Sequence, residues 1–252
     1  PKSIHRSGSW PLVSSANGSM GSTTRADRGL HLPMGLRLLL DSADPASWSA
    51  WLPSGLFHGV TTNPTLLRRA AQPCHLDQLQ WLTAQALDLG AQELHLQAWG
   101  RDLLACGRAL AQLAPGRIWV KLPITRAGAA AARALIADQI PVTFTACYEP
   151  AQVLLAAALG ADYIAPYLGR ISDQGRDGHG ELIRMQRILH SVAPGESLRL
   201  LVASLRSADD LARLAAEGLN TFTISPAIAE ALFAVEATAA AAQQFERDAA
   251  GS

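Results

Sequence analysis

The chain has 252 residues, of which 49% are apolar and 17% are charged, and its 21 Lys and Arg residues are balanced by 21 Asp and Glu residues. This length and apolar fraction suffice for a sizeable core in one large domain or two small ones. The charge balance argues against general binding to nucleic acid or to an anionic membrane, and no 18-residue apolar run is present to span one. We therefore expect neither nucleic acid nor a membrane as a partner of this protein.

The few cysteines and the scattered histidines bear on redox compartment and metal binding. Cys74, Cys106 and Cys147 are too few and too scattered for a disulfide framework or a cysteine zinc site. The seven His residues show no metal-ligand spacing, and His58 and His95 are interpreted as structural. We therefore expect a cytoplasmic protein with no metal ion and no cofactor.

Residues 1–33 are rich in Ser, Gly and Arg, lack hydrophobic periodicity and contain no apolar core of a signal peptide. We interpret this segment as a disordered leader or a remnant of cloning, with a short docked arm as the alternative. A single domain is expected to begin near Met34 and to span residues 34–252.

From residue 36 onward, a short apolar run followed by an Ala- and Leu-rich helical stretch occurs eight times. The expected strands are 36–41, 57–62, 93–98, 118–122, 142–146, 163–168, 198–203 and 221–225. The expected helices lie near 45–52, 65–71, 75–89, 101–113, 127–138, 149–159, 180–192 and 207–216, followed by a long one at 227–248. The glycine-rich segment 175–180 is expected to be a flexible loop at the edge of the site.

Strands that alternate with helices predict βαβ units in a parallel sheet. Asn63-Pro64 and Ser225-Pro226 each have the pattern of an N-cap followed by proline at the first helical position. Eight such units favour a (β/α)8 TIM barrel of class α/β, with a helical outer ring and a C-terminal helix. The alternative, a doubly wound open sheet, lacks support because no glycine-rich dinucleotide motif follows the first expected strand.

The expected strands end on polar side chains, and the carboxyl ends of barrel strands are where active sites form. These strand-end residues are Asp41, Thr62, Asn63, Gln97, Lys121, Thr145, Tyr167, Ser204 and Ser225. A single such residue is commonly a helix cap, and Asp41 and Asn63 are each open to that interpretation. The convergence of them all on one rim favours a binding or catalytic site.

Lys121 is the most informative of these residues. Only Lys2 and Lys121 are lysines, and Lys121 lies inside the apolar run Ile-Trp-Val-Lys-Leu-Pro. An ordinary strand-end lysine extends to solvent or pairs with a carboxylate. Burial here would instead lower the lysine pKa and yield a neutral amine that forms a Schiff base with a ketone or aldehyde. Asp41 or Tyr167 would then supply the acid or base.

Two arginines suggest an anion site. Arg170 follows the sixth expected strand and Arg206 the seventh, and the loops after the late strands of barrels often bind phosphate. Solvated surface charge is the alternative for either arginine alone.

Four segments of this sequence resemble the transaldolase family, in particular its short branch of fructose-6-phosphate aldolases and small transaldolases. They are Gly59-Val-Thr-Thr-Asn-Pro64, Val120-Lys-Leu-Pro-Ile-Thr125, Ala165-Pro-Tyr-Leu-Gly-Arg170 and Val202-Ala-Ser-Leu-Arg206, in the family's order. The resemblance covers about residues 36–240 and leaves out the leader.

The resemblance implies a class I aldolase or transaldolase barrel that acts on a sugar phosphate without a cofactor. The Schiff-base lysine falls on Lys121 and the acid/base aspartate on Asp41. The residue that contacts donor hydroxyls falls on Asn63, next to Thr62, and Thr145 with the strand-three side chain positions a catalytic water. The phosphate ligands fall on Arg170, Ser204 and Arg206. The family's oligomeric short members pack their C-terminal helix on a neighbouring subunit, so a homo-oligomer is expected.

Residues at two positions differ between the main transaldolase branch and the aldolase-like branch of the family. The main transaldolase branch carries Glu on strand three and Phe after strand six, whereas this chain has Gln97 and Tyr167, which are the aldolase-like choices. The expected reaction is cleavage of a ketose phosphate such as fructose 6-phosphate, with release of dihydroxyacetone. One alternative is transfer of that unit to erythrose 4-phosphate. Others are a non-catalytic sugar-phosphate-binding barrel, and an isomerase or synthase in which Lys121 only holds phosphate.

Overall fold

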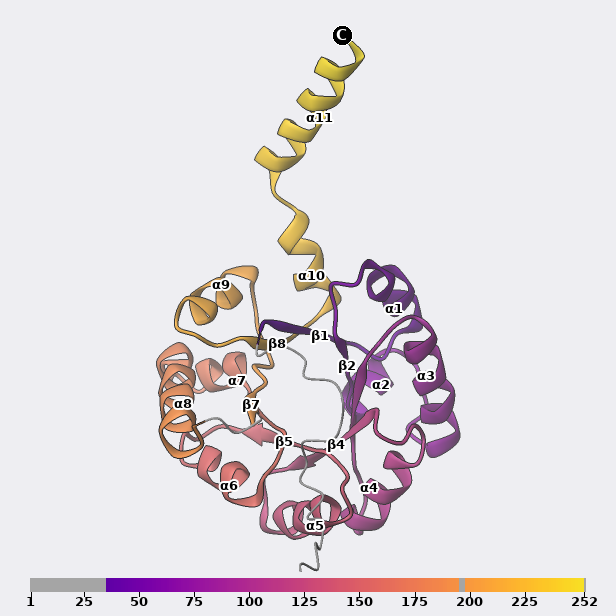
Figure 1. Cartoon of the computed structure of the whole chain (residues 1–252), viewed down its shortest axis with the longest axis vertical. Helices are drawn as coiled ribbons and strands as arrows, with labels where there is room; N and C mark the ends of the chain where they lie inside the picture. Colours follow the sequence, from indigo (N-terminus) through magenta and orange to yellow (C-terminus); the bar gives the residue numbers. More distant parts are fainter. Residues whose placement is uncertain (1–34, 195–197, 252) are drawn as a thin grey trace, which may run out of the picture. The chain divides into compact units, whose positions relative to one another are not determined.

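A computed structural model of the chain describes residues 35–194 and 198–251, so the interpretation of residues 1–33 lies outside the described residues. Eight short strands lie at the centre of the domain, and helices surround them (Figure 1). The strands are β1 Arg37–Asp41, β2 Gly59–Thr61, β3 Glu93–Gln97, β4 Ile118–Pro123, β5 Val142–Cys147, β6 Tyr163–Pro166, β7 Arg199–Leu200 and β8 Thr221–Ile224.

All neighbouring strands pair in parallel, in the order β7-β6-β5-β4-β3-β2-β1-β8. The ring is completed just beyond β7, where Val202 pairs in parallel with Phe222 of β8. The Val202 amide donates to the Thr221 carbonyl, and the Thr223 amide donates to the Val202 carbonyl, both at 2.9 Å. The predicted (β/α)8 barrel is therefore confirmed.

The helices follow the strands along the chain. They are α1 Pro45–Trp51, the 3-10 turn η2 Leu52–Ser54, α2 Pro64–Arg69, α3 Leu76–Asp88, α4 Leu103–Ala111, α5 Arg126–Ala137, α6 Gln152–Leu159, α7 Leu168–Asp173, α8 Gly178–Val192, α9 Ala208–Ala216, α10 Pro226–Phe233 and α11 Glu236–Ala250. Asn63 and Ser225 are the N-caps of α2 and α10, each with proline next, as the sequence predicts.

Three local predictions were wrong. The expected strand 163–168 ends at Pro166, because α7 begins at Leu168. The glycine-rich segment 175–180 is partly helical. The Asp177 side chain accepts a hydrogen bond from the Gly180 amide and so caps α8, which begins at Gly178. The expected helix 227–248 is interrupted after Phe233, where Ala234 leaves the helical region at ψ 58° and a second helix begins at Glu236. The alanine-rich sequence contains no proline or glycine to reveal that break.

Side chains of β1 alternate between two cores. Leu38 and Leu40 of β1 belong to the large cluster beneath the helices, whereas Leu39 belongs to a small cluster inside the barrel. That inner cluster also contains Tyr163, Ala165, Leu201 and Ala203, with Trp119 and Tyr167 packed against it. Because the inner cluster fills the barrel below the strand carboxyl ends, it closes the floor of any pocket that forms there.

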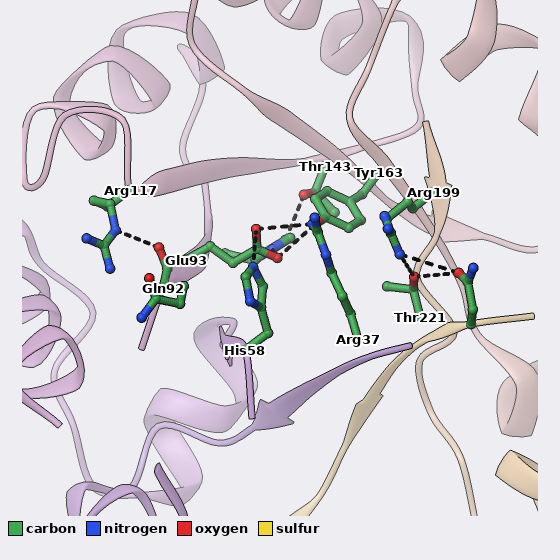
Figure 2. Close-up of polar contacts among 11 residues, drawn as sticks. Arg37, His58, Gln92, Glu93, Arg117, Thr143, Tyr163, Arg199 and Thr221 are labelled. Atoms are coloured by element: carbon green, nitrogen blue, oxygen red, sulfur yellow. Dashed lines mark hydrogen bonds and ion pairs between the residues drawn. The ribbon is translucent and has the colours of Figure 1, made fainter. Parts of the chain in front are cut away.

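A charged network occupies the interior near the strand starts (Figure 2). The buried Glu93 carboxylate accepts from the Tyr163 hydroxyl at 2.8 Å and lies 3.2 Å from His95 Nε2. His58 Nε2 at 3.4 Å and Arg37 Nη1 at 3.7 Å face its other oxygen, and Arg37 also donates to Tyr163. Both histidines thus have structural partners, as the sequence interpretation expected.

Candidate active site

A pocket of about 320 Å³ opens at the carboxyl ends of the strands. Its lining contains many of the predicted site residues, namely Asp41, Asn63, Lys121, Thr145, Tyr167, Arg170, Ser204 and Arg206. These residues come from β1, β4 and β5 and from the segments that follow β2, β6 and β7. The volume is in the range of pockets that hold small molecules.

Lys121 lies on β4 and is only 6% exposed. Its Nζ atom donates to the backbone carbonyl of Thr62 at 2.8 Å. Among the described residues, no carboxylate forms an ion pair with it within 4 Å. Burial lowers the pKa of Lys121, because an ammonium loses its hydration there, and the charge of Asp41 opposes this effect. Burial thus makes the neutral amine more accessible than in an exposed lysine.

Asp41 at the end of β1 is not a helix cap. The cap of α1 is Asp44, whose carboxylate accepts from the amides of Ala46 and Ser47. The Asp41 carboxylate instead accepts from the Thr61 hydroxyl at 2.6 Å. Since Thr61 uses its proton in this bond, the neighbouring Thr223 hydroxyl is the donor in the Thr61–Thr223 contact. Asp41 is thereby held at the pocket wall with acceptor capacity left over for a ligand.

Asn63 combines the two interpretations that the sequence left open. Its side-chain oxygen accepts from the amides of Thr65 and Leu66, at 2.9 and 3.0 Å, and so caps α2. The residue nevertheless lines the pocket. Because the oxygen is occupied by the cap, the amide NH2 is the part that remains to contact a ligand.

Gln97 and Thr62 do not line the pocket. The Gln97 amide donates to the Lys121 carbonyl at 3.1 Å, and its oxygen accepts from the Thr145 hydroxyl at 3.2 Å. The structure thus brings together the two side chains to which the resemblance assigns a catalytic water. Thr62 contributes its backbone carbonyl to Lys121, and its buried hydroxyl has no partner among the described residues. Ser225 caps α10 through the Ile228 amide.

Tyr167 lies on the side of the pocket formed by β6. Burial raises the pKa of its phenol, so the hydroxyl stays protonated at neutral pH. The guanidinium of Arg170 lies over its ring, 5.0 Å from the centroid, and also donates to the Tyr148 hydroxyl at 3.5 Å. Tyr148 meets Tyr167 edge to face at 5.7 Å. The two aromatic rings therefore orient the arginine toward the pocket.

Ser204 and Arg206 form the neighbouring wall. Ser204 has a left-handed backbone at φ 59°, and its carbonyl accepts from the Gly169 amide at 2.8 Å. A Cβ on residue 169 would come within 2.5 Å of that carbonyl and 2.3 Å of Arg206 Nε, so only glycine allows this approach. Arg206 pairs with the exposed Asp173 at 2.6 Å.

Sequence reasoning missed several lining residues, among them Thr61, Arg69, Asp173 and Thr223. Thr61 and Thr223 lie on the two strands that neighbour β1, which carries Asp41. The alternation of side chains along those expected strands could have indicated that both threonines face inward. Arg69 lies four residues after Thr65, on the same face of α2, and both line the pocket. That helical spacing was the available signal.

A parallel barrel with a buried lysine, two aspartates and three arginines around one pocket has the architecture of a barrel enzyme. The chain belongs to the Transaldolase/Fructose-6-phosphate aldolase family, whose model matches residues 38–251. This confirms the family resemblance drawn from the four sequence segments.

Two relatives show the extent of the match. A protein named probable transaldolase from Caulobacter vibrioides (strain NA1000 / CB15N) is 35% identical over 216 residues, covering 84% of this chain and 96% of the relative. A probable transaldolase from Rhodospirillum centenum (strain ATCC 51521 / SW) is 32% identical over 216 residues, covering 84% and 90%.

Solved structures agree with the fold. A thiamine phosphate pyrophosphorylase from Pyrococcus furiosus superposes with a TM-score of 0.53 at 14% identity, covering 75% of this chain and 85% of that one. At such identity the likeness shows the fold alone. In the described part of the chain, no helix is long and apolar enough to cross a membrane, and no group of three or more His, Cys, Asp or Glu side chains could hold a metal ion.

Proposed function

We propose that the protein is a class I aldolase or transaldolase that forms a Schiff base between Lys121 and the C2 ketone of a ketose phosphate such as fructose 6-phosphate. The observation that carries the proposal is the state of Lys121. It is buried at the floor of the pocket, has no carboxylate partner within ion-pair distance in the described part of the chain, and has a lowered pKa. A neutral amine facing a polar cavity is a nucleophile for a carbonyl.

The steps follow from the arrangement of the side chains. Lys121 Nζ adds to the C2 carbonyl, and loss of water from the carbinolamine leaves an iminium. Asp41 removes the C4 hydroxyl proton, the C3–C4 bond breaks, and its electron pair moves to the iminium and forms an enamine. The aldose phosphate then leaves. Arg170 and Arg206 hold the distal phosphate and so orient the scissile bond.

The fate of the enamine separates cleavage from transfer. Protonation and hydrolysis release dihydroxyacetone, whereas attack on a second aldehyde transfers the unit. Tyr167 lines the pocket and keeps its proton at neutral pH, so we assign it as the proton donor, and we assign the water to Thr145, which lines the pocket and is hydrogen-bonded to Gln97. These residues favour cleavage. Transfer is the second candidate, favoured by the relatives named probable transaldolase.

Trapping with borohydride tests the Schiff base. Incubation with fructose 6-phosphate and sodium borohydride should reduce the iminium to a stable secondary amine. Since Lys2 and Lys121 are the only lysines, peptide mapping by mass spectrometry distinguishes the specific adduct from random reaction. The Lys121→Met variant is the control and should give no adduct. An unmodified Lys121 peptide from the active wild type would refute the mechanism.

Product analysis then assigns the reaction. Free dihydroxyacetone from fructose 6-phosphate alone indicates an aldolase. Sedoheptulose 7-phosphate formed only with erythrose 4-phosphate indicates a transaldolase. Neither product, together with sugar-phosphate binding, would indicate a non-catalytic barrel. Retained activity in Lys121→Arg would indicate that Lys121 only holds phosphate, because arginine cannot replace an amine nucleophile.

The remaining features belong to the same proposal. The enzyme acts in the cytoplasm as a homo-oligomer and uses neither a cofactor nor a metal ion. Residues 34–252 form the single catalytic domain.

A further inference from the structure

Arg69 is a pocket residue to which the proposed mechanism gives no role. It is the last residue of α2, it is exposed, and it lines the pocket together with Thr65 and Leu66. Within residues 35–194 and 198–251, no hydrogen bond, ion pair or ring contact joins it to another side chain. Its guanidinium donors are therefore available to a ligand.

The two other arginines of the pocket differ in this respect. Arg170 lies over the Tyr167 ring and donates to Tyr148, and Arg206 shares its charge with Asp173. Arg68, next to Arg69 on α2, is also exposed but does not line the pocket. Two adjacent arginines on one helix thus differ in what they face.

The strand order places Arg69 across the pocket from Arg170 and Arg206. Its helix follows β2, and Arg170 follows β6, which is four strands away in either direction around the ring. Side chains of a helix tilt toward its N-terminus, and here that end is Asn63 at the pocket rim. Arg69 therefore reaches the pocket from the wall opposite Arg170.

The charges at the mouth leave room for a third cation. A phosphate monoester carries a charge of about −1.5 to −2 at pH 7. Because Asp41 and Asp173 also line the pocket, their carboxylates offset the charges of Arg170 and Arg206, and Lys121 is neutral in the proposed mechanism. Arg69 would give the pocket the net positive charge that a bound phosphate requires.

We propose that Arg69 is a specificity-determining residue that binds a phosphoryl group of the substrate from the α2 side of the pocket. The inference rests on the proposed function. The group is either the distal phosphate, which three guanidinium groups would then share, or a phosphate at the opposite end of the sugar. Both sources have the same chemistry, and substrate comparison separates them.

The experiment measures kcat and KM for wild type, Arg69→Ala and the matched control Arg68→Ala. The substrates are fructose 6-phosphate, fructose 1,6-bisphosphate and unphosphorylated fructose. Arg69→Ala should lower kcat/KM for a phosphorylated sugar by about tenfold, mainly through KM, as expected for a lost charge-assisted hydrogen bond. Activity on fructose should stay unchanged, and Arg68→Ala should match wild type throughout.

The pattern of losses identifies the phosphate. A loss with fructose 6-phosphate assigns Arg69 to the distal group, and a loss confined to the bisphosphate assigns it to the other end. Equal losses on all three sugars, or identical behaviour of Arg69→Ala and Arg68→Ala, would overturn the proposal.

A binding measurement separates this proposal from the proposed function. If wild type turns over none of the sugars, the proposed function fails, and calorimetric titration with inorganic phosphate decides the role of Arg69. Weaker phosphate binding by Arg69→Ala than by Arg68→Ala supports that role. Equal binding by the two variants overturns it.

Discussion

Replacement of Glu93 by glutamine should strongly destabilise the barrel. The carboxylate is almost fully buried and faces four groups, with Tyr163 and His95 on one oxygen and His58 and Arg37 on the other (Figure 2). Glutamine keeps the shape, but its NH2 group would lie against either the Tyr163 hydroxyl or the Arg37 guanidinium, both of which donate. Arg37 also loses its carboxylate partner.

The magnitude follows from the loss of one member of a buried ion pair. Such losses cost about 3–5 kcal/mol. Arg37 is 3.7 Å from the carboxylate and its side chain is 16% exposed, so it regains some hydration, and we expect a cost near the lower end, about 3 kcal/mol. Typical domains have a free energy of unfolding of about 5–15 kcal/mol, so the variant should still fold.

Denaturant unfolding at several pH values is the assay. Burial raises the pKa of Glu93, but hydrogen bonds with His58 and His95 outweigh this effect, so the pKa lies below its usual 4.5. A carboxylate with a lowered folded-state pKa stabilises the fold above the unfolded-state value and loses this contribution as pH falls. The difference between wild type and Glu93→Gln should therefore be full near pH 7 and shrink below about pH 4.5.

Glu181→Gln is the matched control, because Glu181 pairs with Arg176 at 2.8 Å in a more exposed position. It should cost less than about 1 kcal/mol. A Glu93→Gln variant as stable as this control, or a difference that grows as pH falls, would refute the reasoning.

Two further predictions concern the pocket. Asp41→Asn should move the pH dependence of borohydride trapping to lower pH, because the Asp41 charge raises the pKa of Lys121 and its removal leaves the lowering by burial unopposed; an unchanged or higher midpoint would contradict this electrostatic coupling. Gly169→Ala should raise KM for fructose 6-phosphate by at least about tenfold, because the new Cβ would displace the Ser204 carbonyl and Arg206. Gly251→Ala, where a Cβ meets nothing closer than 3.6 Å, is its control and should leave this KM unchanged.

Much of the architecture is present in local sequence patterns. Alternating apolar runs and helical stretches specify eight βα units, because each pattern depends on residues close together in the chain. The polar strand ends and the isolated Lys121 follow from the same reading, since parallel strands bring their carboxyl ends to one rim. Short elements such as α7, and the break between α10 and α11, gave no comparable local signal.

Only the tertiary structure determined which of these side chains meet. Gln97 turns toward Thr145 and the Lys121 carbonyl and away from the pocket, and Arg69 faces it while Arg68 does not. The Glu93 network joins groups as far apart in sequence as residues 37 and 163. Such contacts depend on strand register and ring closure, which are cooperative properties of the whole barrel and have no counterpart in any single segment.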